Sequence, residues 1–277
     1  MKIGFDNEKY CVIQSEHIRE RIAKFNGKLY LELGGKLFDD HHASRVLPGF
    51  QPDSKLKMLS QLSDRAEIVI VISAVDIEKN KVRGDLGITY DEDVLRLRTE
   101  FQKRGFLVGS VVITHYNGQS SADLYREKLE RFGIKAYYHY TIDGYPTNVA
   151  LIDSEDGFGR NDYVETTRPL VIVTAPGPGS GKMAVCLSQL YQEHKRGIEA
   201  GYAAKEVGSV LRAGNLCVLE STSPPYSTRM VEKIVSEISG LAPEQFMTAH
   251  CPERIIPGRM LIELRENDRI IGSNRPE

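Results

Sequence analysis

The sequence predicts an α/β fold in which a mainly parallel, doubly wound sheet is covered by helices on both faces. Short apolar runs rich in β-branched residues alternate with amphipathic helical patterns along most of the chain, which is typical of a parallel sheet. Residues 68–72, IVIVI, are continuously apolar, as in strands that are buried on both faces. In addition, one apolar run leads through a glycine-rich loop directly into a helical pattern.

Each expected element follows from the period of its apolar side chains and from the residues that bound it. The 3.6-residue period predicts helices over residues 7–26, 54–62, 91–103, 120–132 and 183–195. Apolar or alternating runs predict strands over residues 29–33, 68–72, 106–114, 134–140 and 170–173. Gly105 and Gly133 end two of the helices, because glycine is favoured just after a helix C-terminus. The aromatic residues 137–140 are interpreted as strand residues with a structural role.

Residues 170–182, LVIVTAPGPGSGK, form the first candidate site. Glycines let the backbone approach a ligand closely, unpaired N–H groups at a helix start point towards it, and a lysine adds positive charge. The match to a P-loop is incomplete, because Pro176 replaces its first glycine and Met183 replaces the hydroxyl residue that binds magnesium. We predict a site for ATP or another phosphorylated ligand, and the alternative is a turn without a ligand. The predicted phosphate-binding residues are Gly177, Gly179, Ser180, Gly181 and Lys182.

A second dense group of polar residues lies in residues 31–50, after a predicted strand. An aspartate together with a histidine suits metal binding or acid–base chemistry, and an arginine suits a phosphate. The alternative is a solvated loop held by local ion pairs. The candidate residues are Lys36, Asp39, Asp40, His42 and Arg45.

Other polar residues stand at strand ends or in loops. Ligands of parallel sheets bind beyond the carboxyl ends of the strands, and residues 34–36 (GGK) and 114–116 (THY) follow or end predicted strands. Arg83 and Asp85, in a loop before a predicted helix, form a third polar candidate, again with a purely structural alternative.

Composition narrows the functional classes. The 277 residues carry a formal net charge of -2, with 27% of them charged, which provides no basic surface for nucleic acid or for a membrane. The four cysteines show no CxxC pair or metal-ligand spacing, and we predict no metal site. The first residues lack an apolar segment of signal-peptide length, and residues 66–75 are too few to span a bilayer. A cytoplasmic protein is expected, since unpaired thiols suit a reducing compartment.

Long motifs occur in order along the front of the chain. They are KLYLELGGKLFDDHHASRVLPGF, RGDLGITYDEDVLRL, GSVVITHYNGQSSAD, the GYPT turn and VTAPGPGSGKMAVCLSQLYQEHKRGIEAGYA. On these motifs, residues 1–203 resemble the bacterial domain-of-unknown-function family eighteen-forty-six. The resemblance implies no particular reaction, and members of that family run considerably longer than this chain.

The rest of the chain contains different motifs, GNLCVLESTSPP at residues 214–225 and FMTAHCPERIIPGRMLIELREND at residues 246–268. They are similar to the UDP-N-acetylmannosamine dehydrogenases of the UDP-glucose/GDP-mannose dehydrogenase superfamily. The resemblance implies a partial Rossmann fragment, in which Thr222 lies beside the nicotinamide and Glu253 takes part in the oxidation. The superfamily's glycine fingerprint, catalytic lysine and thiolate cysteine have no counterpart here. The fragment is therefore expected to be inactive alone and to use NAD only if another chain completes it.

We therefore expect a truncated, Rossmann-like α/β domain over residues 1–203 and a dehydrogenase fragment over residues 204–277, joined in a fused or truncated product. The alanine-rich residues 200–214 predict a helix across the junction, and residues 216–219 and 246–248 predict strands that extend the front sheet or pack loosely. Three functions remain: a phosphate- or nucleotide-binding protein of open reaction, an NAD-dependent dehydrogenase fragment, and a binding or assembly module without catalysis. The predicted partner is a small phosphorylated ligand; homo-oligomerisation and enzymatic activity stay open.

Overall fold

The computed structural model divides into two compact units, Met1–Lys205 and Glu206–Glu277. In the first unit it describes residues 6–25, 27–33, 37, 38, 49, 51–145 and 147–203. In the second unit it describes residues 216–219, 228, 229, 232, 233, 236, 241–250, 272 and 273.

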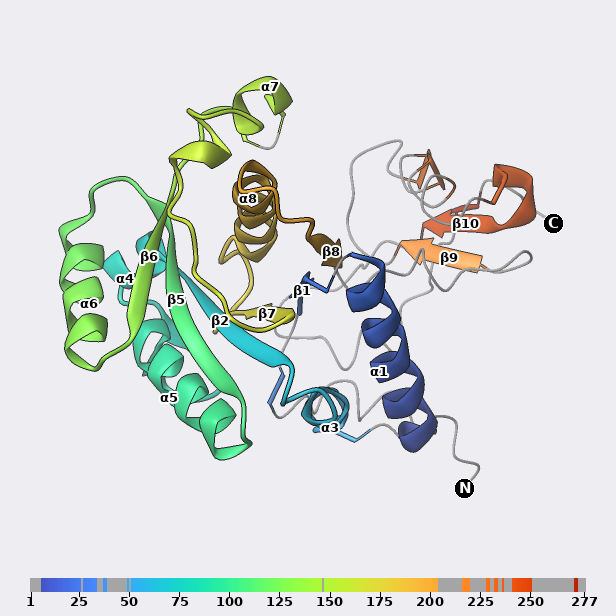
Figure 1. Ribbon diagram of the computed structural model, residues 1–277, viewed down its shortest axis with the longest axis horizontal. Coiled ribbons are helices and arrows are strands. Elements are labelled where there is room, and N and C mark those ends of the chain that lie inside the picture. The colour runs from blue at the N-terminus through green and yellow to red at the C-terminus, as the bar shows by residue number, and fades with distance from the viewer. Residues whose placement is uncertain are drawn as a thin grey trace. The chain divides into compact units, whose positions relative to one another are not determined.

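A six-stranded parallel sheet forms the centre of the first unit (Figure 1). Its strands are β1 (Leu29–Glu32), β2 (Ala66–Ser73), β5 (Leu107–Tyr116), β6 (Lys135–Tyr140), β7 (Leu170–Thr174) and β8 (Gly201–Ala203). Their spatial order is β6-β5-β2-β7-β1-β8, and every neighbouring pair is parallel. The chain therefore winds outward from β2 to β6 and then crosses back to β7, on the other side of β2. The predicted α/β fold with a mainly parallel sheet is confirmed.

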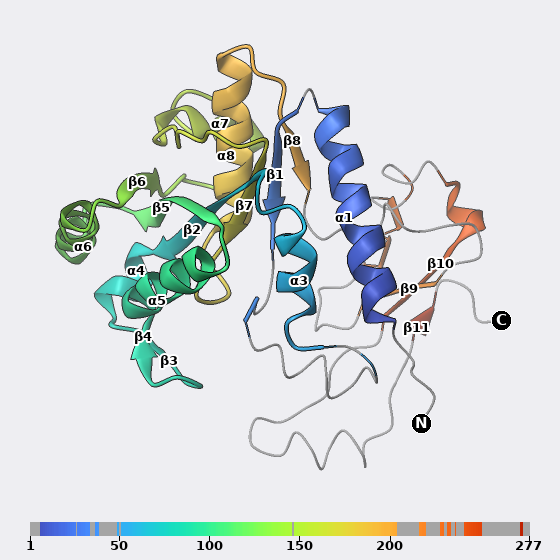
Figure 2. The ribbon, with the colours of Figure 1, turned by 60° about the horizontal axis from the view of Figure 1, so that its bottom comes forward.

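Helices cover both faces of the sheet, which is therefore doubly wound (Figure 2). The helices α1 (Asn7–Lys24), α3 (Ser54–Ser60), α4 (Ala74–Glu78), α5 (Tyr90–Lys103) and α6 (Ser120–Arg131) pack their apolar side chains into one core. The helix α8 (Lys182–Lys195) packs into a second core on the opposite face, against the short helix η1 (Phe158–Arg160) that follows α7 (Val149–Ile152). A small hairpin of β3 (Val82–Arg83) and β4 (Ile88–Thr89) leads into α5.

Strand β2 contributes side chains to both cores. All of its residues are buried. Ile68, Ile70 and Ile72 belong to the core under α1, α3, α5 and α6, whereas Val69 and Val71 belong to the core under α8. Burial of one such aliphatic side chain stabilises a protein by about 1.5–3 kcal/mol. The expectation of a strand buried on both faces at residues 68–72 is confirmed.

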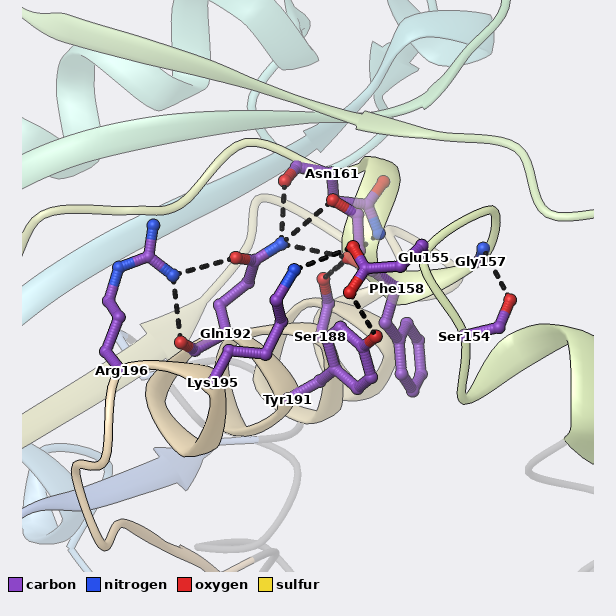
Figure 3. Close-up of polar contacts among 11 residues, drawn as sticks. Ser154, Glu155, Gly157, Phe158, Asn161, Ser188, Tyr191, Gln192, Lys195 and Arg196 are labelled. Carbon is purple, nitrogen blue, oxygen red and sulfur yellow. Dashed lines mark hydrogen bonds and ion pairs between the residues drawn. The ribbon is translucent and has the colours of Figure 1, made fainter.

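The segment of residues 154–164, here called the strap, crosses α8 and holds it in place (Figure 3). Gln192 Nε2 donates hydrogen bonds to three carbonyl oxygens of the strap, those of Phe158 (3.2 Å), Gly159 (3.1 Å) and Asn161 (3.1 Å). Asn161 Nδ2 in turn donates to Ser188 Oγ on α8 (3.0 Å). These buried polar groups satisfy one another, so the position of α8 is specified by directional bonds as well as by packing.

The strap also covers the exposed edge of β6. Asp162 Oδ2 accepts the Tyr138 N–H (2.7 Å), the Asp162 N–H donates to the Tyr138 carbonyl (3.1 Å), and Asn161 Oδ1 accepts the Tyr140 N–H (2.8 Å). An uncovered edge strand presents unpaired backbone groups that invite pairing with another chain. The strap therefore connects the edge of the sheet to the helix that follows the glycine-rich loop.

Gly109 in β5 leaves room for the buried carboxylate of Glu67 on the neighbouring strand β2. A Cβ atom at position 109 would lie 1.9 Å from Glu67 Oε1. The carboxylate is held in place, because Glu67 Oε2 accepts hydrogen bonds from the Thr167 N–H (2.7 Å), Thr167 Oγ1 (3.1 Å) and the Arg168 N–H (3.3 Å). These bonds attach the segment that precedes β7 to the start of β2.

We expect Gly109→Ala to lower the free energy of unfolding by about 1–3 kcal/mol, the typical cost of adding a methyl group to a packed site. Gly84→Ala is the matched control, since a Cβ atom at Gly84 meets nothing within 4 Å. Urea unfolding of the two variants, followed by circular dichroism, measures the difference. Equal midpoints would mean that the Glu67 carboxylate relocates at no cost.

The described part of the second unit contains a three-stranded sheet. The strand β9 (Leu216–Leu219) pairs in parallel with β10 (Met247–His250), and β11 (Gly272–Ser273) pairs antiparallel with β10. The short helix η3 (Pro243–Gln245) precedes β10. Strands were expected at residues 216–219 and 246–248, and they are present, with β10 displaced by one residue at its start. They pair with each other instead of extending the six-stranded sheet, which corrects that part of the expectation.

The expected helix over residues 200–214 is wrong for residues 201–203, which form β8 at the edge of the six-stranded sheet beside β1. Gly201 packs against the ring of Phe25, where a Cβ atom would lie 2.1 Å from the ring, and Tyr202 Oη donates to Glu32 Oε2 (2.8 Å). Pairing with β1 therefore outweighs the helical propensity of the alanines, a preference of only tenths of a kcal/mol per residue. Residues 204–214 lie outside the described residues.

Candidate phosphate-binding site

The glycine-rich loop, residues 175–181, connects β7 to α8 at the carboxyl edge of the sheet. The strand β7 lies next to β2, and the helices after these two strands lie on opposite faces, α8 on one and α4 and α5 on the other. In open α/β sheets the place where the chain diverges in this way is the usual position of a ligand site. The predicted loop therefore occupies that position.

Three contacts set the path of the loop. A Cβ atom at Gly177 would lie 2.5 Å from Tyr90 Oη and 2.6 Å from its ring, so the ring of Tyr90 packs directly on the backbone here. Ser180 Oγ donates to the Gly177 carbonyl (2.6 Å), and Thr114 Oγ1 donates to the Ser180 carbonyl (2.7 Å). Gly181 precedes α8 with a φ of 80°, which only glycine adopts without strain.

The loop leaves a run of backbone donors free. The N–H groups of Gly177 and of residues 179–184 have no hydrogen-bond partner among the described residues, and the first bond of the helix runs from the Val185 N–H to the Gly181 carbonyl (3.0 Å). The half-buried Lys182 forms no ion pair within the described part of the chain. Free amides at a helix N-terminus, together with the helix dipole, favour a bound anion. The predicted residues Gly177, Gly179, Ser180, Gly181 and Lys182 thus lie together.

Strands β2, β5 and β6 bring three further polar side chains to the same edge. His115 Nδ1 lies 3.1 Å from Ser73 Oγ and 3.4 Å from Thr114 Oγ1. His139 on β6 is buried beside the backbone of Ala184 and near His115, and burial lowers its pKa to about 4. Its Nε2 atom has no hydrogen-bond partner among the described residues. The loop is therefore bordered by two imidazoles, of which His139 is neutral at pH 7.

The sequence prediction included the strand end at residues 114–116 but missed Ser73 and His139. The signal for Ser73 was available: a serine between a buried strand and a helix is a preferred N-cap, and Ser73 Oγ accepts the Val75 N–H (3.2 Å). The signal for His139 was weaker, because a histidine among strand tyrosines fits an amphipathic strand equally well.

Arg83 and Asp85 lie together in the hairpin before α5. Arg83 pairs with Asp85 (2.9 Å) and with the buried Asp93 on α5 (2.7 Å), and Arg96 also pairs with Asp93 (2.6 Å). The bonds to Asp85 and Asp93 raise the pKa of Arg83, so it stays charged. The network attaches the hairpin to α5. A ligand role for Arg83 and Asp85 stays a prediction.

Other predicted site residues lie outside the described residues. They are Lys36, Asp39, Asp40, His42 and Arg45 in the first unit, and Thr222 and Glu253 in the second. Among the residues that the structure does describe, no group of three His, Cys, Asp or Glu side chains is arranged to hold a metal ion. In the same part of the chain, no helix combines the length and apolar character needed to cross a bilayer.

A cavity of about 620 Å³ lies at the opposite, amino edge of the sheet, around the start of β6. Its charged lining residues already have partners: Lys135 pairs with Glu165 (2.8 Å), and the Arg196 guanidinium lies 3.8 Å from the ring centre of Tyr163. Ligand sites of parallel sheets lie at the carboxyl edge. The loop at residues 175–181 is therefore the stronger candidate.

The fold and the loop together define a Rossmann-like α/β protein with a glycine-rich loop at the carboxyl edge of its sheet. The chain belongs to the family described as domain of unknown function DUF1846, N-terminal, whose model matches residues 3–212. It is 60% identical over 205 residues to a UPF0371 protein of Corynebacterium aurimucosum and 57% identical to one of Streptococcus sanguinis. These alignments cover 74% of this chain but only 41% and 42% of the relatives, so the chain spans about two fifths of their length.

The C-terminal region matches a second family. The NAD binding domain of the UDP-glucose/GDP-mannose dehydrogenase family matches residues 197–277. Both resemblances expected from the sequence motifs are therefore confirmed. Among solved structures, an NDP-N-acetyl-D-galactosaminuronic acid dehydrogenase from Methanosarcina mazei is similar at 21% identity, covering 79% of this chain and 42% of that one, with a TM-score of 0.24.

Proposed function

We propose that the first unit binds the phosphate group of a nucleotide or of another small phosphorylated molecule at the loop of residues 175–181 and the first turn of α8. One observation carries the proposal: the N–H groups of residues 179–184 are consecutive, lack a partner among the described residues and stand at the start of a 14-residue helix, with Lys182 among them. Each such donor stabilises an anion more than it would stabilise a neutral group.

The residues of the loop bear on whether the bound phosphate needs a magnesium ion. Met183 occupies the position where a P-loop has the hydroxyl that holds magnesium, and a thioether is a poor ligand for a hard cation. We therefore expect phosphate binding that does not depend on magnesium. The function proposed for the loop is binding of the phosphate group.

Isothermal titration calorimetry of the full chain with ATP and with pyrophosphate, in EDTA, tests this proposal. Lys182→Ala should weaken binding about tenfold, which corresponds to about 1.4 kcal/mol, because it removes the one side-chain cation of the loop. Lys195→Ala is the matched control, since Lys195 lies at the other end of the same helix and pairs with Glu155 (2.6 Å). Absence of binding by the unmodified chain, or equal affinities of the two variants, would contradict the proposal.

A second candidate function concerns the second unit and is favoured by the match of residues 197–277 to an NAD-binding domain. The strands β9 and β10 pair in parallel, as neighbouring strands of such a domain do. Thr222 and Glu253 follow these two strands in the sequence and are the residues proposed to contact the nicotinamide and to take part in oxidation. A rise in melting temperature with NAD would support this function, and no shift at millimolar NAD would argue against it. If neither NAD nor phosphate stabilises the chain, the assembly module without catalysis remains.

A further inference from the structure

The end of β5 departs from regular strand geometry beside the glycine-rich loop. The pairing of β5 with β6 shifts register between Ile113 and Tyr116, and His115, within this interval, has a φ of 51°. A histidine in the left-handed region is uncommon, and such strained residues cluster at functional sites. Irregularities of this kind re-aim a side chain next to an active site. The unusual backbone conformation of His115 therefore sets the direction of its side chain.

The ring of His115 is connected to the loop by a chain of polar contacts. Its Nδ1 atom lies 3.1 Å from Ser73 Oγ and 3.4 Å from Thr114 Oγ1, and Thr114 Oγ1 donates to the Ser180 carbonyl at 2.7 Å. The ends of two strands, β2 and β5, and the loop are thus linked through this ring and Thr114. Ser180 belongs to the run of residues whose N–H groups are free.

These contacts assign the proton of the neutral imidazole. Ser73 Oγ already accepts the Val75 N–H, so its own proton is available to His115 Nδ1. Thr114 donates its proton to the Ser180 carbonyl, so towards the ring it can only accept, at the longer distance of 3.4 Å. Ser73 is buried, and its hydroxyl has no other acceptor among the described residues. We therefore assign Nδ1 as the acceptor of the Ser73 proton, which places the proton of the neutral ring on Nε2.

The Nε2 atom of His115 is free to bind a ligand. It forms no hydrogen bond with any described residue, and the residue is only partly buried. Burial lowers the pKa of His115, with the charge of Asp76 opposing this effect, so the ring is neutral at pH 7. His139 on β6 lies near both His115 and Ala184, whose N–H is the last of the free run.

We propose that His115 completes the phosphate site by donating its Nε2–H to an oxygen of the bound phosphate, and that Ser73 positions the ring by fixing its tautomer. The inference rests on the phosphate site proposed above and adds a neutral donor from β5 to the backbone amides and Lys182. It also gives a physical reason for the strained backbone at His115, which the fold alone does not require.

Nuclear magnetic resonance of the full chain, labelled with ¹⁵N, tests the proposal directly. Long-range ¹H–¹⁵N spectra should show His115 as the Nε2–H tautomer, and the Nε2 resonance should move when inorganic phosphate or pyrophosphate is added. The amides of residues 179–184 should move in the same titration. If these amides move but His115 Nε2 does not, the role of His115 is wrong and the phosphate site stands. If neither moves, both proposals are overturned.

Two variants separate binding from structure. His115→Asn should weaken pyrophosphate binding about fivefold without loss of folding, because asparagine tolerates the left-handed backbone conformation. Ser73→Ala should increase the Nδ1–H tautomer of His115 in the absence of any ligand, a readout that a purely structural role would not change. His17→Asn, an exposed position on α1, is the control for both. Unchanged affinity in the folded His115→Asn variant would overturn the proposal.

Discussion

Replacing Glu193 with alanine should lower the free energy of unfolding of the first unit by about 3–5 kcal/mol, the cost of breaking a buried ion pair by removing one partner. The Glu193 side chain is fully buried on α8, where it pairs with the Lys28 ammonium and accepts a hydrogen bond from Tyr30 Oη (2.7 Å). Tyr163 Oη donates to its other oxygen (3.3 Å). Without the carboxylate, the buried Tyr30 hydroxyl and the largely buried Lys28 lose their partner.

The measurement is urea unfolding followed by near-ultraviolet circular dichroism, since the chain contains 13 tyrosines and no tryptophan. Glu127→Ala is the matched control, because Glu127 forms an exposed pair with Arg131 on α6, and such pairs contribute about 0–1 kcal/mol. Hydrogen exchange of the α8 and β7 amides assigns the transition to the first unit. A loss below about 1 kcal/mol for Glu193→Ala would show that Lys28 and Tyr30 find other partners.

Acidification from pH 6.5 to pH 4 should cost the first unit about 3 kcal/mol through His139 alone. Burial lowers the pKa of His139 from 6.5 to about 4 in the folded chain. Between these values the unfolded chain binds a proton that the folded chain rejects, so stability falls as the pH falls through this window. The contribution is fully present above pH 6.5, and the loss is complete below about pH 4.

Comparison of unfolding free energies at pH 7 and pH 4.5 in wild type and in His139→Asn isolates this contribution. The difference between the two pH values should shrink by about 2–3 kcal/mol in the variant, which has no imidazole to protonate. His17→Asn, which removes an exposed histidine of α1, should keep the wild-type difference. An unchanged pH dependence in His139→Asn would mean that the folded chain accommodates a charged His139.

Much of the local structure was predictable from the sequence because it depends on neighbours in the chain. The buried run at residues 68–72 became β2, and the pattern at residues 170–195 became β7, the loop and α8. Gly105 and Gly133 follow α5 and α6 as expected. The helix α4 was missed, and β8 was mistaken for part of a helix. Both elements are short, and the residues that β8 pairs with and that α4 packs against lie far away in the sequence.

The residues of the candidate site also fall into two groups, those that were predictable from local sequence and those that were not. The glycines and Lys182 were predictable, because a glycine-rich run directly before a helical pattern indicates a loop whose backbone N–H groups point towards a ligand. The partners of Arg83 were not, because Asp93 reaches it only once the hairpin has folded onto α5. The meeting of Ser73, His115 and His139 was equally hidden, since they come from three strands whose order in the sheet is not written in any local pattern.

The residue pattern was enough to predict a parallel α/β sheet and a strand, glycine-rich loop and helix of the kind that can bind an anion, because hydrophobic period and glycine placement act over a few residues. What surrounds that loop depends on the tertiary structure. The order β6-β5-β2-β7-β1-β8 places Thr114 against Ser180, and His139 beside the first turn of α8. Tyr90 packs against Gly177. Strand order depends on burial and pairing summed over the whole chain, and the contacts of Tyr90 and Thr114 with the loop form only once that order is in place.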